Sequence, residues 1–261
     1  NAVSSNAKLT VIPNPSIITQ PTSSQGGICA GANTTFSVSA SNVIFYQWQV
    51  DTGFGFTDVT NTAPYSGANT STLTITGTTA EMNGYTYRAV AVGTCNLAAV
   101  SNNVILAVNH INVALTKVDV KCYGDLTGQA TATATNGTGS YTYSWSPSGG
   151  TAATASGLAA GTYTVTVTDG NKCETKESIT ITQPASGLSA TTASTGVSCF
   201  GGSNGTASVN VSGGSPGYLY SWAPLGGVTQ SISGRPAGDY TCTITDANGC
   251  TLVKTVEIKG P

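Results

Sequence analysis

A stretch of 65 residues occurs twice in this chain of 261 residues. Residues 120–184 align with 197–261 at a constant offset of 77, and 26 of the 65 aligned positions are identical. The identities include tryptophan and cysteine positions, so that Cys122 corresponds to Cys199. A fixed period with matched cysteines indicates two copies of one module. The period is longer than that of a solenoid repeat, so we expect each copy to be a small domain.

Alternating residues predict strands in both copies. Residues 162–168 place Tyr163, Val165 and Val167 on one face and threonines on the other. Such period-2 alternation is typical of half-buried strands. Turn signals rich in glycine, serine and proline separate the strands, and no segment has a convincing helical pattern. The sequence therefore predicts an all-β protein built from β-sandwiches.

The section from 13 to 109 has a different pattern of strands. It resembles an immunoglobulin-like domain, with Trp48 as the core tryptophan of its third strand and Tyr87 as a tyrosine-corner residue. Ala89 stands where the second cysteine of such a domain is expected. The usual disulfide between the two sheets is therefore not expected.

These patterns divide the chain into segments. Residues 2–11 resemble 99–108, so we expect 1–12 to be the last strand of a preceding immunoglobulin-like module and the chain to be a window of a longer array. The segments that follow are the immunoglobulin-like module (13–109), the first repeat (110–186) and the second repeat (187–261). Short linkers that contain proline limit swinging between domains. We expect tandem immunoglobulin-like β-sandwiches that form an elongated rod.

Seven cysteines suggest one disulfide in each domain. The expected bridges are Cys122–Cys173, Cys199–Cys250 and Cys29–Cys95. Disulfides imply an oxidising location outside the cytoplasm. Cys242 is left over, and its counterpart Val165 lies on the inward strand face, so we expect a buried free thiol. Intermolecular crosslinking or nucleophilic chemistry are the alternatives for Cys242.

The charged residues argue against several functions. They make up 8% of the chain, its net charge is -2, and its nine basic residues form no cluster, which argues against nucleic-acid binding. No apolar run reaches the roughly 18 residues of a membrane helix. His110 is the single histidine, lies in a linker and has no serine held beside it. Carboxylates are scattered, so we expect no catalytic residue, no cofactor and no enzyme activity.

Two aspartates recur in the pattern Asp-x-Asn-x-Cys. Asp169 and Asp246 precede the last strand of each copy, and the main expectation is a turn in which they bond their own backbone. The alternative is a calcium site that Asp125 would share. The second copy has Gly202 in place of Asp125, which weakens that alternative.

The aromatic residues have two interpretations. Those inside alternating strands are expected to form the cores: Trp48, Tyr87, Trp145 and Trp222. The tyrosines that flank two of the tryptophans could instead form an exposed face that contacts a glycan: Tyr141, Tyr143, Tyr218 and Tyr220.

Three motifs carry a family resemblance. They are residues 197–205 (Val-Ser-Cys-Phe-Gly-Gly-Ser-Asn-Gly), 161–169 (Gly-Thr-Tyr-Thr-Val-Thr-Val-Thr-Asp) and 246–250 (Asp-Ala-Asn-Gly-Cys). Together they resemble the SprB repeat of very large surface adhesins in gliding bacteria, over about 118–261. The first copy departs from the motif at Asp125 and Lys172. The resemblance implies extracellular display at the cell surface, type IX secretion and propulsion by the gliding machinery.

The expected function is therefore mechanical. We expect a stalk segment of a large adhesin used in attachment and gliding motility, whose partners are neighbouring modules of the same chain, the export and gliding machinery, and a surface polysaccharide or substratum bound by regions outside this segment. The alternatives are a glycan-binding module and an accessory β-sandwich region of a secreted hydrolase.

Overall fold

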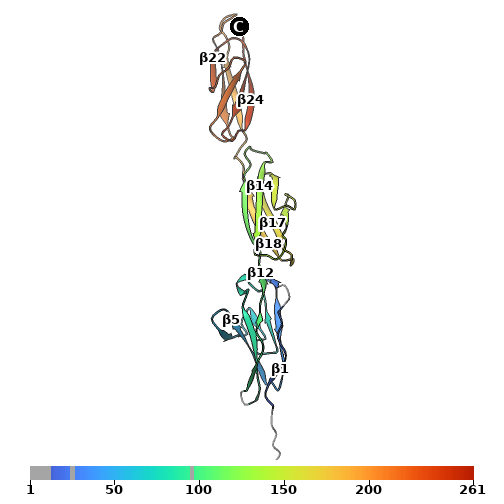
Figure 1. The fold of residues 1–261 in the computed structure, drawn as a ribbon. Coiled ribbons are helices and arrows are strands. Elements are labelled where there is room, and N and C mark those ends of the chain that lie inside the picture. The colour runs from blue at the N-terminus through green and yellow to red at the C-terminus, as the bar shows by residue number, and fades with distance from the viewer. Residues whose placement is uncertain (1–12, 24–26, 95–96) are drawn as a thin grey trace, which may run out of the picture. The chain divides into compact units, whose positions relative to one another are not determined.

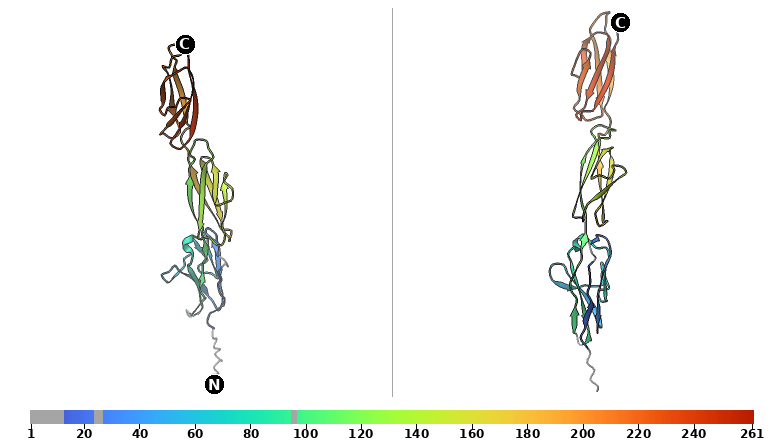
Figure 2. Two further views of the ribbon diagram at one scale, coloured as in Figure 1. Left: turned by 45° about the horizontal axis from the view of Figure 1, so that its top comes forward. Right: turned by 45° about the vertical axis from the view of Figure 1, so that its right-hand side comes forward.

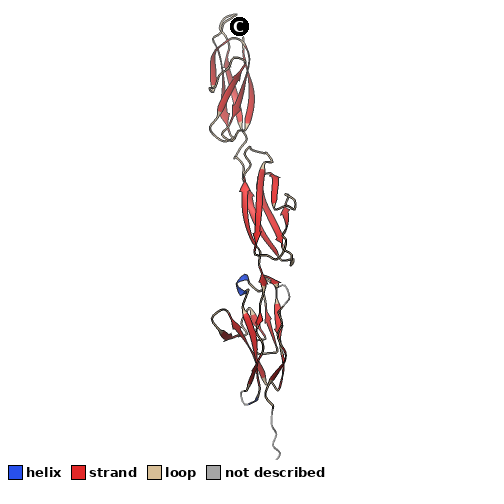
Figure 3. Cartoon of the chain, in the orientation of Figure 1, coloured by secondary structure: helices blue, strands red, loops and turns tan. Residues whose placement is uncertain are grey.

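The computed structural model describes residues 13–23, 27–94 and 97–261. Within these ranges the regular structure is β, apart from one 3-10 turn at Ala80–Met82 (Figure 3). A membrane-spanning helix, long and apolar enough to cross a bilayer, is not found in these ranges. The strand expected in 1–12 and the residue Cys95 lie outside the described residues. The chain is a tandem of immunoglobulin-like sandwiches, in agreement with the prediction.

The immunoglobulin-like module holds twelve of the strands (Figure 1). Its larger sheet has the order β10-β9-β5-β6, with β11 also paired to β9, and a second sheet has the order β3-β8-β7. Two further pairs, β1 with β4 and β12 with β2, complete the module. The bounds are β1 Ser16–Thr19, β2 Ile28–Cys29, β3 Thr34–Ser37, β4 Ser39–Ser41, β5 Phe45–Asp51, β6 Phe56–Asp58, β7 Tyr65–Ser66, β8 Thr72–Ile75, β9 Thr86–Val92, β10 Ala98–Val100, β11 Val104–Ile105 and β12 Val108–Asn109.

Aromatic side chains fill the core of this module. Trp48 on β5 is fully buried, and its indole N–H donates to the Thr70 carbonyl at 3.0 Å. The rings of Phe36 and Tyr87 lie 5.3 Å apart between their centroids. Ala89 is fully buried where a disulfide cysteine would stand. Aromatic packing therefore joins the two sheets at this position, because large rings bury more apolar surface than a cystine does.

Each repeat is built from two three-stranded sheets. Figure 2 shows their strands in two further orientations. The orders are β13-β14-β16 and β15-β17-β18 in the first repeat, and β19-β20-β22 and β21-β23-β24 in the second. The bounds are β13 Asn112–Val118, β14 Gly128–Thr135, β15 Thr142–Ser146, β16 Thr154–Leu158, β17 Gly161–Thr168, β18 Glu174–Ile181, β19 Ser189–Thr195, β20 Gly205–Ser212, β21 Leu219–Ala223, β22 Ser231–Arg235, β23 Gly238–Thr245 and β24 Thr251–Ile258.

The matched residues of the repeats have matched structural roles. Trp145 and Trp222 are buried, and their indole N–H groups donate to carbonyls seven residues further on, at 3.0 and 2.9 Å. The hydroxyls of Tyr163 and Tyr240 donate to carbonyls four residues upstream, as in a tyrosine corner. The hydroxyl of Tyr87 lies instead 3.1 Å from that of Tyr65. The prediction that Tyr87 is a tyrosine-corner residue is therefore wrong, whereas Tyr163 and Tyr240 of the repeats make the tyrosine-corner bond.

A glycine at the start of a strand lets the two sheets of a repeat approach each other. A Cβ atom added to Gly128 would lie 2.7 Å from the side chain of Ile181 and 2.7 Å from the Leu158 carbonyl. Gly205 has the same environment, against Ile258 and the Arg235 carbonyl. No larger residue fits there without a shift of its neighbours, which explains why this position is glycine in both copies.

The contacts between Cα atoms divide the chain into two compact units. One holds the described residues up to Asn112 together with 134–141 and 167–175. The other holds 113–133, 142–166 and 176–261. The first unit thus includes the immunoglobulin-like module and two loops of the first repeat. The domain boundaries given above remain predictions.

Candidate functional site

An aspartate organises the turn before the last strand of the second repeat. One oxygen of Asp246, Oδ1, accepts the backbone N–H groups of Asn248 and Cys250, both at 2.9 Å. The other, Oδ2, accepts the N–H of Ser215 at 2.9 Å. Asp246 is buried, with only 3% of its surface exposed. This carboxylate holds the turn in one conformation and places Cys250 directly before β24.

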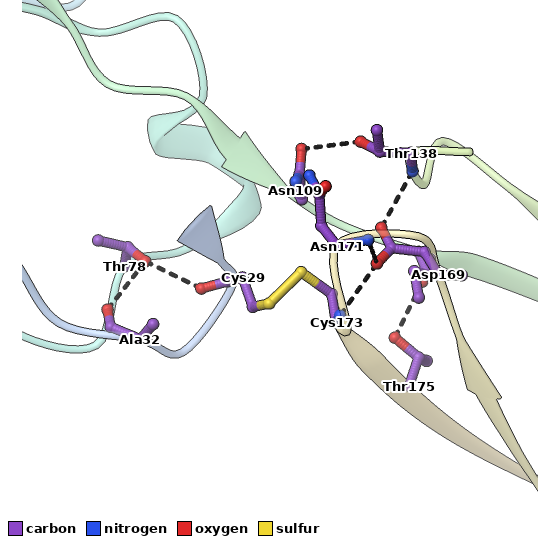
Figure 4. Close-up of a disulfide and its surroundings, with 10 residues drawn as sticks. Cys29, Ala32, Thr78, Asn109, Thr138, Asp169, Asn171, Cys173 and Thr175 are labelled. Carbon is purple, nitrogen blue, oxygen red and sulfur yellow. Dashed lines mark hydrogen bonds between the residues drawn. A yellow bond between two sulfur atoms is a disulfide. The ribbon is translucent and has the colours of Figure 1, made fainter. Parts of the chain in front are cut away.

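The first repeat has the same arrangement. Asp169 Oδ1 accepts the N–H groups of Asn171 and Cys173, both at 2.9 Å, and its Oδ2 accepts that of Thr138 at 3.0 Å (Figure 4). The repeated pattern Asp-x-Asn-x-Cys is therefore a device that presents a cysteine at a fixed position.

Each presented cysteine forms a disulfide with a cysteine of the preceding module. Cys173 is bonded to Cys29, with a sequence separation of 144 and Cα atoms 5.2 Å apart (Figure 4). Cys250 is bonded to Cys122, with a separation of 128 and Cα atoms 5.7 Å apart. Cys199 is free and exposed.

The predicted disulfide pairings are wrong. The structure contains neither Cys122–Cys173 nor Cys199–Cys250, and Cys199 is not in a disulfide there. Cys29 pairs with Cys173 and not with Cys95, which lies outside the described residues.

The physical reason is that the two cysteines of a repeat lie at opposite ends of its last strand. Cys250 directly precedes β24, whereas the N–H of Val197, two residues before Cys199, donates to the carbonyl of Lys259, just after β24. A strand of eight residues spans about 26 Å. A disulfide requires Cα atoms about 4.4–6.8 Å apart, so this pair cannot close.

Polar contacts surround both disulfides. The side-chain amide of Asn248 donates to the Lys121 carbonyl at 2.8 Å, beside the Cys122–Cys250 bond. A cleft of about 450 Å³ there is lined by residues including Tyr123, Asp125 and Leu188. At the other disulfide, Thr175 Oγ1 donates to the Ile111 carbonyl at 3.3 Å. Sequence reasoning missed Lys121 because a main-chain oxygen leaves no signature in side chains.

Each of the two repeats contains a segment that matches the model of a known family. Residues 114–150 and 191–227 match the family model of the SprB repeat. The two segments resemble SprB repeats, and we call the two modules that contain them the first and the second SprB repeat. Each match covers the first cysteine and the tryptophan of its repeat, whereas the aspartate turn and the second cysteine follow beyond it.

Comparison with solved structures finds tandem immunoglobulin domains. The eight N-terminal domains of Down syndrome cell adhesion molecule are 12% identical, with 97% of this chain and 37% of that chain covered and a TM-score of 0.49. The titin I-band fragment I67–I69 is 12% identical, with 96% and 100% covered and a TM-score of 0.43. The strand pairings of the sheets establish the fold. Comparison with curated proteins finds no match.

The aspartates of the SprB repeats face hydrogen-bond donors. Both carboxylate oxygens of Asp169 and Asp246 accept backbone N–H groups, as the turn interpretation expects. Burial raises the pKa of the Asp246 carboxyl, but the backbone N–H groups that point at it, led by that of Ser215, outweigh burial and hold its pKa below the ordinary value. Asp125 lines the cleft that Asp246 also lines. Among the described residues, no group of three or more His, Cys, Asp or Glu side chains is placed to hold a metal ion.

The tyrosines proposed to contact a glycan do not form an exposed face. Tyr141, Tyr143, Tyr218 and Tyr220 are all half-buried. Tyr218 and Tyr220 pack against the core of the second SprB repeat, on the same side as Trp222. The exposed side of β15 consists of Thr142 and other hydroxyl residues. The expected aromatic platform is therefore absent from β15 and β21.

His110 lines a small pocket in the described part of the chain. Its other lining residues are Ala80, Asn83, Val108 and Asn136. None of these four carries a hydroxyl, thiol or carboxylate, so the pocket offers no partner for nucleophilic catalysis.

Two of the described cysteines are free, and their environments differ. Cys242 is fully buried in the core of the second SprB repeat, and burial raises the pKa of its thiol. Cys199 is exposed.

We expect a thiol reagent to separate these two cysteines by rate. Because the thiolate is the reactive form, iodoacetamide at pH 8 should label Cys199 within minutes and Cys242 only after unfolding. Peptide mass spectrometry of the native protein measures each site separately, with Cys242→Val as the control, since Val165 fills that position in the first repeat. Prompt labelling of Cys242 in the native protein would contradict its burial.

Proposed function

We propose that this segment is a non-catalytic part of the stalk of a cell-surface adhesin, used in attachment and gliding motility. The SprB repeats and the tandem sandwiches support a structural role of this kind. Export by the type IX pathway, display outside the cell and attachment to a surface polysaccharide or other substratum belong to the same proposal. The disulfides support a location outside the cytoplasm, where cystine bonds persist.

The observation that carries the proposal is that the two disulfide loops overlap. The Cys29–Cys173 loop and the Cys122–Cys250 loop share residues 122–173. A pulling force that enters before Cys29 passes directly to Cys173 through the cystine bond. Residues 30–121, which include most of the immunoglobulin-like module, therefore lie off the shortest covalent path.

This arrangement suits a protein that transmits tension. Single disulfides inside modules would protect each module separately and would leave the linkers between modules to carry the force. Overlapping loops instead place the connections between consecutive modules under covalent protection. A stalk needs this, because its function is to hold two ends at a limited separation.

The proposal can be tested on the native protein in its source cells. An antibody against residues 13–261 should label intact cells, and the polypeptide that it captures should have an intact mass of several hundred kilodaltons. In-frame removal of the segment should weaken surface attachment while the protein remains displayed. Labelling only after permeabilisation would overturn the proposal. So would capture of a polypeptide near a hundred kilodaltons that carries a hydrolase domain.

A further inference from the structure

The end of the second SprB repeat that carries Cys199 has the same features as the end of the first repeat that carries Cys122, where the following repeat is bonded. Cys199 corresponds to Cys122, which is bonded to Cys250. The loops around the two cysteines have the same backbone hydrogen bonds. The Val120 N–H donates to Thr182 at 2.9 Å and that of Val197 to Lys259 at 3.0 Å. The Asp125 N–H donates to Cys122 at 3.1 Å and that of Gly202 to Cys199 at 2.9 Å.

The aromatic residues that follow these two cysteines can be compared in the same way, by their exposure and their surroundings. Tyr123 follows Cys122, is 52% exposed, and lines the cleft beside the Cys122–Cys250 bond. Its ring faces Gly187, where an added Cβ atom would lie 3.5 Å from Tyr123 Cδ1. Phe200 follows Cys199 and is 97% exposed. Large apolar side chains exposed to this degree mark contact surfaces when apolar neighbours surround them.

Phe200 has such neighbours. It lines an apolar pocket of about 260 Å³ together with Val197, Pro236, Ala237 and Pro261. We propose that this pocket and Cys199 form a docking surface for the Asp-x-Asn-x-Cys turn of a further SprB repeat placed after residue 261, and that the turn cysteine forms a disulfide with Cys199. The partner is specified by continuity: the cysteines Cys29 and Cys122 both bond to such a turn in the module that follows.

The backbone can supply the accompanying polar contact. At the junction between the two repeats, the Asn248 side chain donates to a main-chain oxygen, that of Lys121. Ser198 occupies the position of Lys121 in the second repeat, and its main-chain oxygen is the same acceptor. Gly202 stands where Asp125 lines the cleft at the occupied junction, so the docking surface of the second repeat lacks that carboxylate.

Bond formation requires an oxidant, and a small-molecule disulfide such as glutathione disulfide supplies it. The Cys199 thiolate attacks one sulfur of that disulfide, which gives a mixed disulfide and one released thiol. The turn cysteine, as thiolate, then attacks Cys199 Sγ and releases the second thiol. In total two cysteine thiols are oxidised to one cystine, and one disulfide is reduced to two thiols.

The experiment extends the protein by one repeat. A second copy of residues 185–261 is added after Pro261, with its own Cys199 replaced by serine and with Thr251→Ser beside its turn cysteine, so that its cysteine peptides differ in mass from those of the original repeat. The product is oxidised in a glutathione buffer and mapped by non-reducing peptide mass spectrometry. We expect most chains to contain a bond between Cys199 and the added copy of Cys250, formed at a rate that does not change over about a hundred-fold dilution, because the reaction is intramolecular. The Cys122–Cys250 bond in the same chains is the internal control for folding and oxidation.

Two variants separate docking from simple crosslinking. When the turn cysteine of the added repeat is replaced by serine, docking alone should slow the labelling of Cys199 by iodoacetamide relative to the chain that ends at 261. During oxidation of the reduced extended chain, Phe200→Ala should slow formation of the new bond. The proposal is overturned if Cys199 stays free, remains bonded to glutathione, or is found bonded to Cys199 of a second copy. These outcomes concern the purified protein, and none of them depends on the proposed function in cells.

Discussion

Stretching the oxidised chain by its two ends should extend it to about one third of the length reached by the reduced chain. In the reduced protein all 261 residues contribute, which corresponds to roughly 900 Å at about 3.5 Å per residue. In the oxidised protein the shortest covalent path runs from the N-terminus to Cys29, crosses to Cys173, returns to Cys122 and crosses to Cys250. That path contains about 90 residues, so the extension should stop at roughly 300 Å.

Single-molecule force spectroscopy measures this length directly. Cys29→Ser and Cys173→Ser should lengthen the oxidised chain by the same amount, because each removes the same bond. Cys242→Val is the matched control and should leave the length unchanged, since Cys242 is in no disulfide. If Cys173→Ser instead behaved like Cys122→Ser, the bond would lie within the first repeat and the overlapping loops would not exist.

The cysteine pairing is the clearest case in which the sequence was insufficient. The repeat shows that Cys122 and Cys199 are equivalent, and the alternating pattern after Cys173 predicts a strand there. Neither observation says at which end of the sandwich each cysteine lies, because that depends on how β13, β14 and β18 are arranged in the two sheets. Pairing within a domain was the simplest assumption, and the length of the last strand excludes it.

The prediction that four tyrosines form an exposed face is wrong, for a reason that the sequence does contain. Tyr141, Tyr143 and Trp145 are spaced two residues apart, and residues with that spacing in a strand point to one face. A buried Trp145 therefore places Tyr143 on the inner side. The strands themselves were predicted well: the alternation over 162–168 corresponds to β17, Gly161–Thr168. Period-2 patterns identify such strands reliably because each has one buried and one solvated face.

Removing the Asp246 carboxylate should destabilise the second SprB repeat strongly. In Asp246→Ala the backbone N–H groups of Ser215, Asn248 and Cys250 lose their acceptor. Donors left unsatisfied in a buried turn each cost on the order of 1–3 kcal/mol, so we expect the free energy of unfolding of this repeat to fall by about 3 kcal/mol or more. Hydrogen exchange followed by mass spectrometry on peptides from β23 and β24 reports this local free energy.

A matched control and a conservative variant make the test specific. Asp239 lies exposed on β23 of the same repeat, and Asp239→Ala should change the free energy of unfolding by no more than about 0.5 kcal/mol. Asp246→Asn keeps one carbonyl oxygen for Asn248 and Cys250 but turns an N–H donor toward Ser215, so its loss should be intermediate. Equal losses for Asp239→Ala and Asp246→Ala would show that only the removal of negative charge matters.

The pH dependence should identify the charged carboxylate as the stabilising form. The folded pKa of Asp246 lies below its ordinary value. A carboxyl group of this kind contributes its full stability above its unfolded pKa, near about 4, and loses the contribution as the pH falls through the folded pKa. The difference in unfolding free energy between wild type and Asp246→Asn should therefore be largest at neutral pH and should shrink in acid.

Because this turn also presents Cys250, Asp246→Ala should slow re-formation of the Cys122–Cys250 bond after reduction at neutral pH. Such a result would connect the turn to the overlapping disulfide loops.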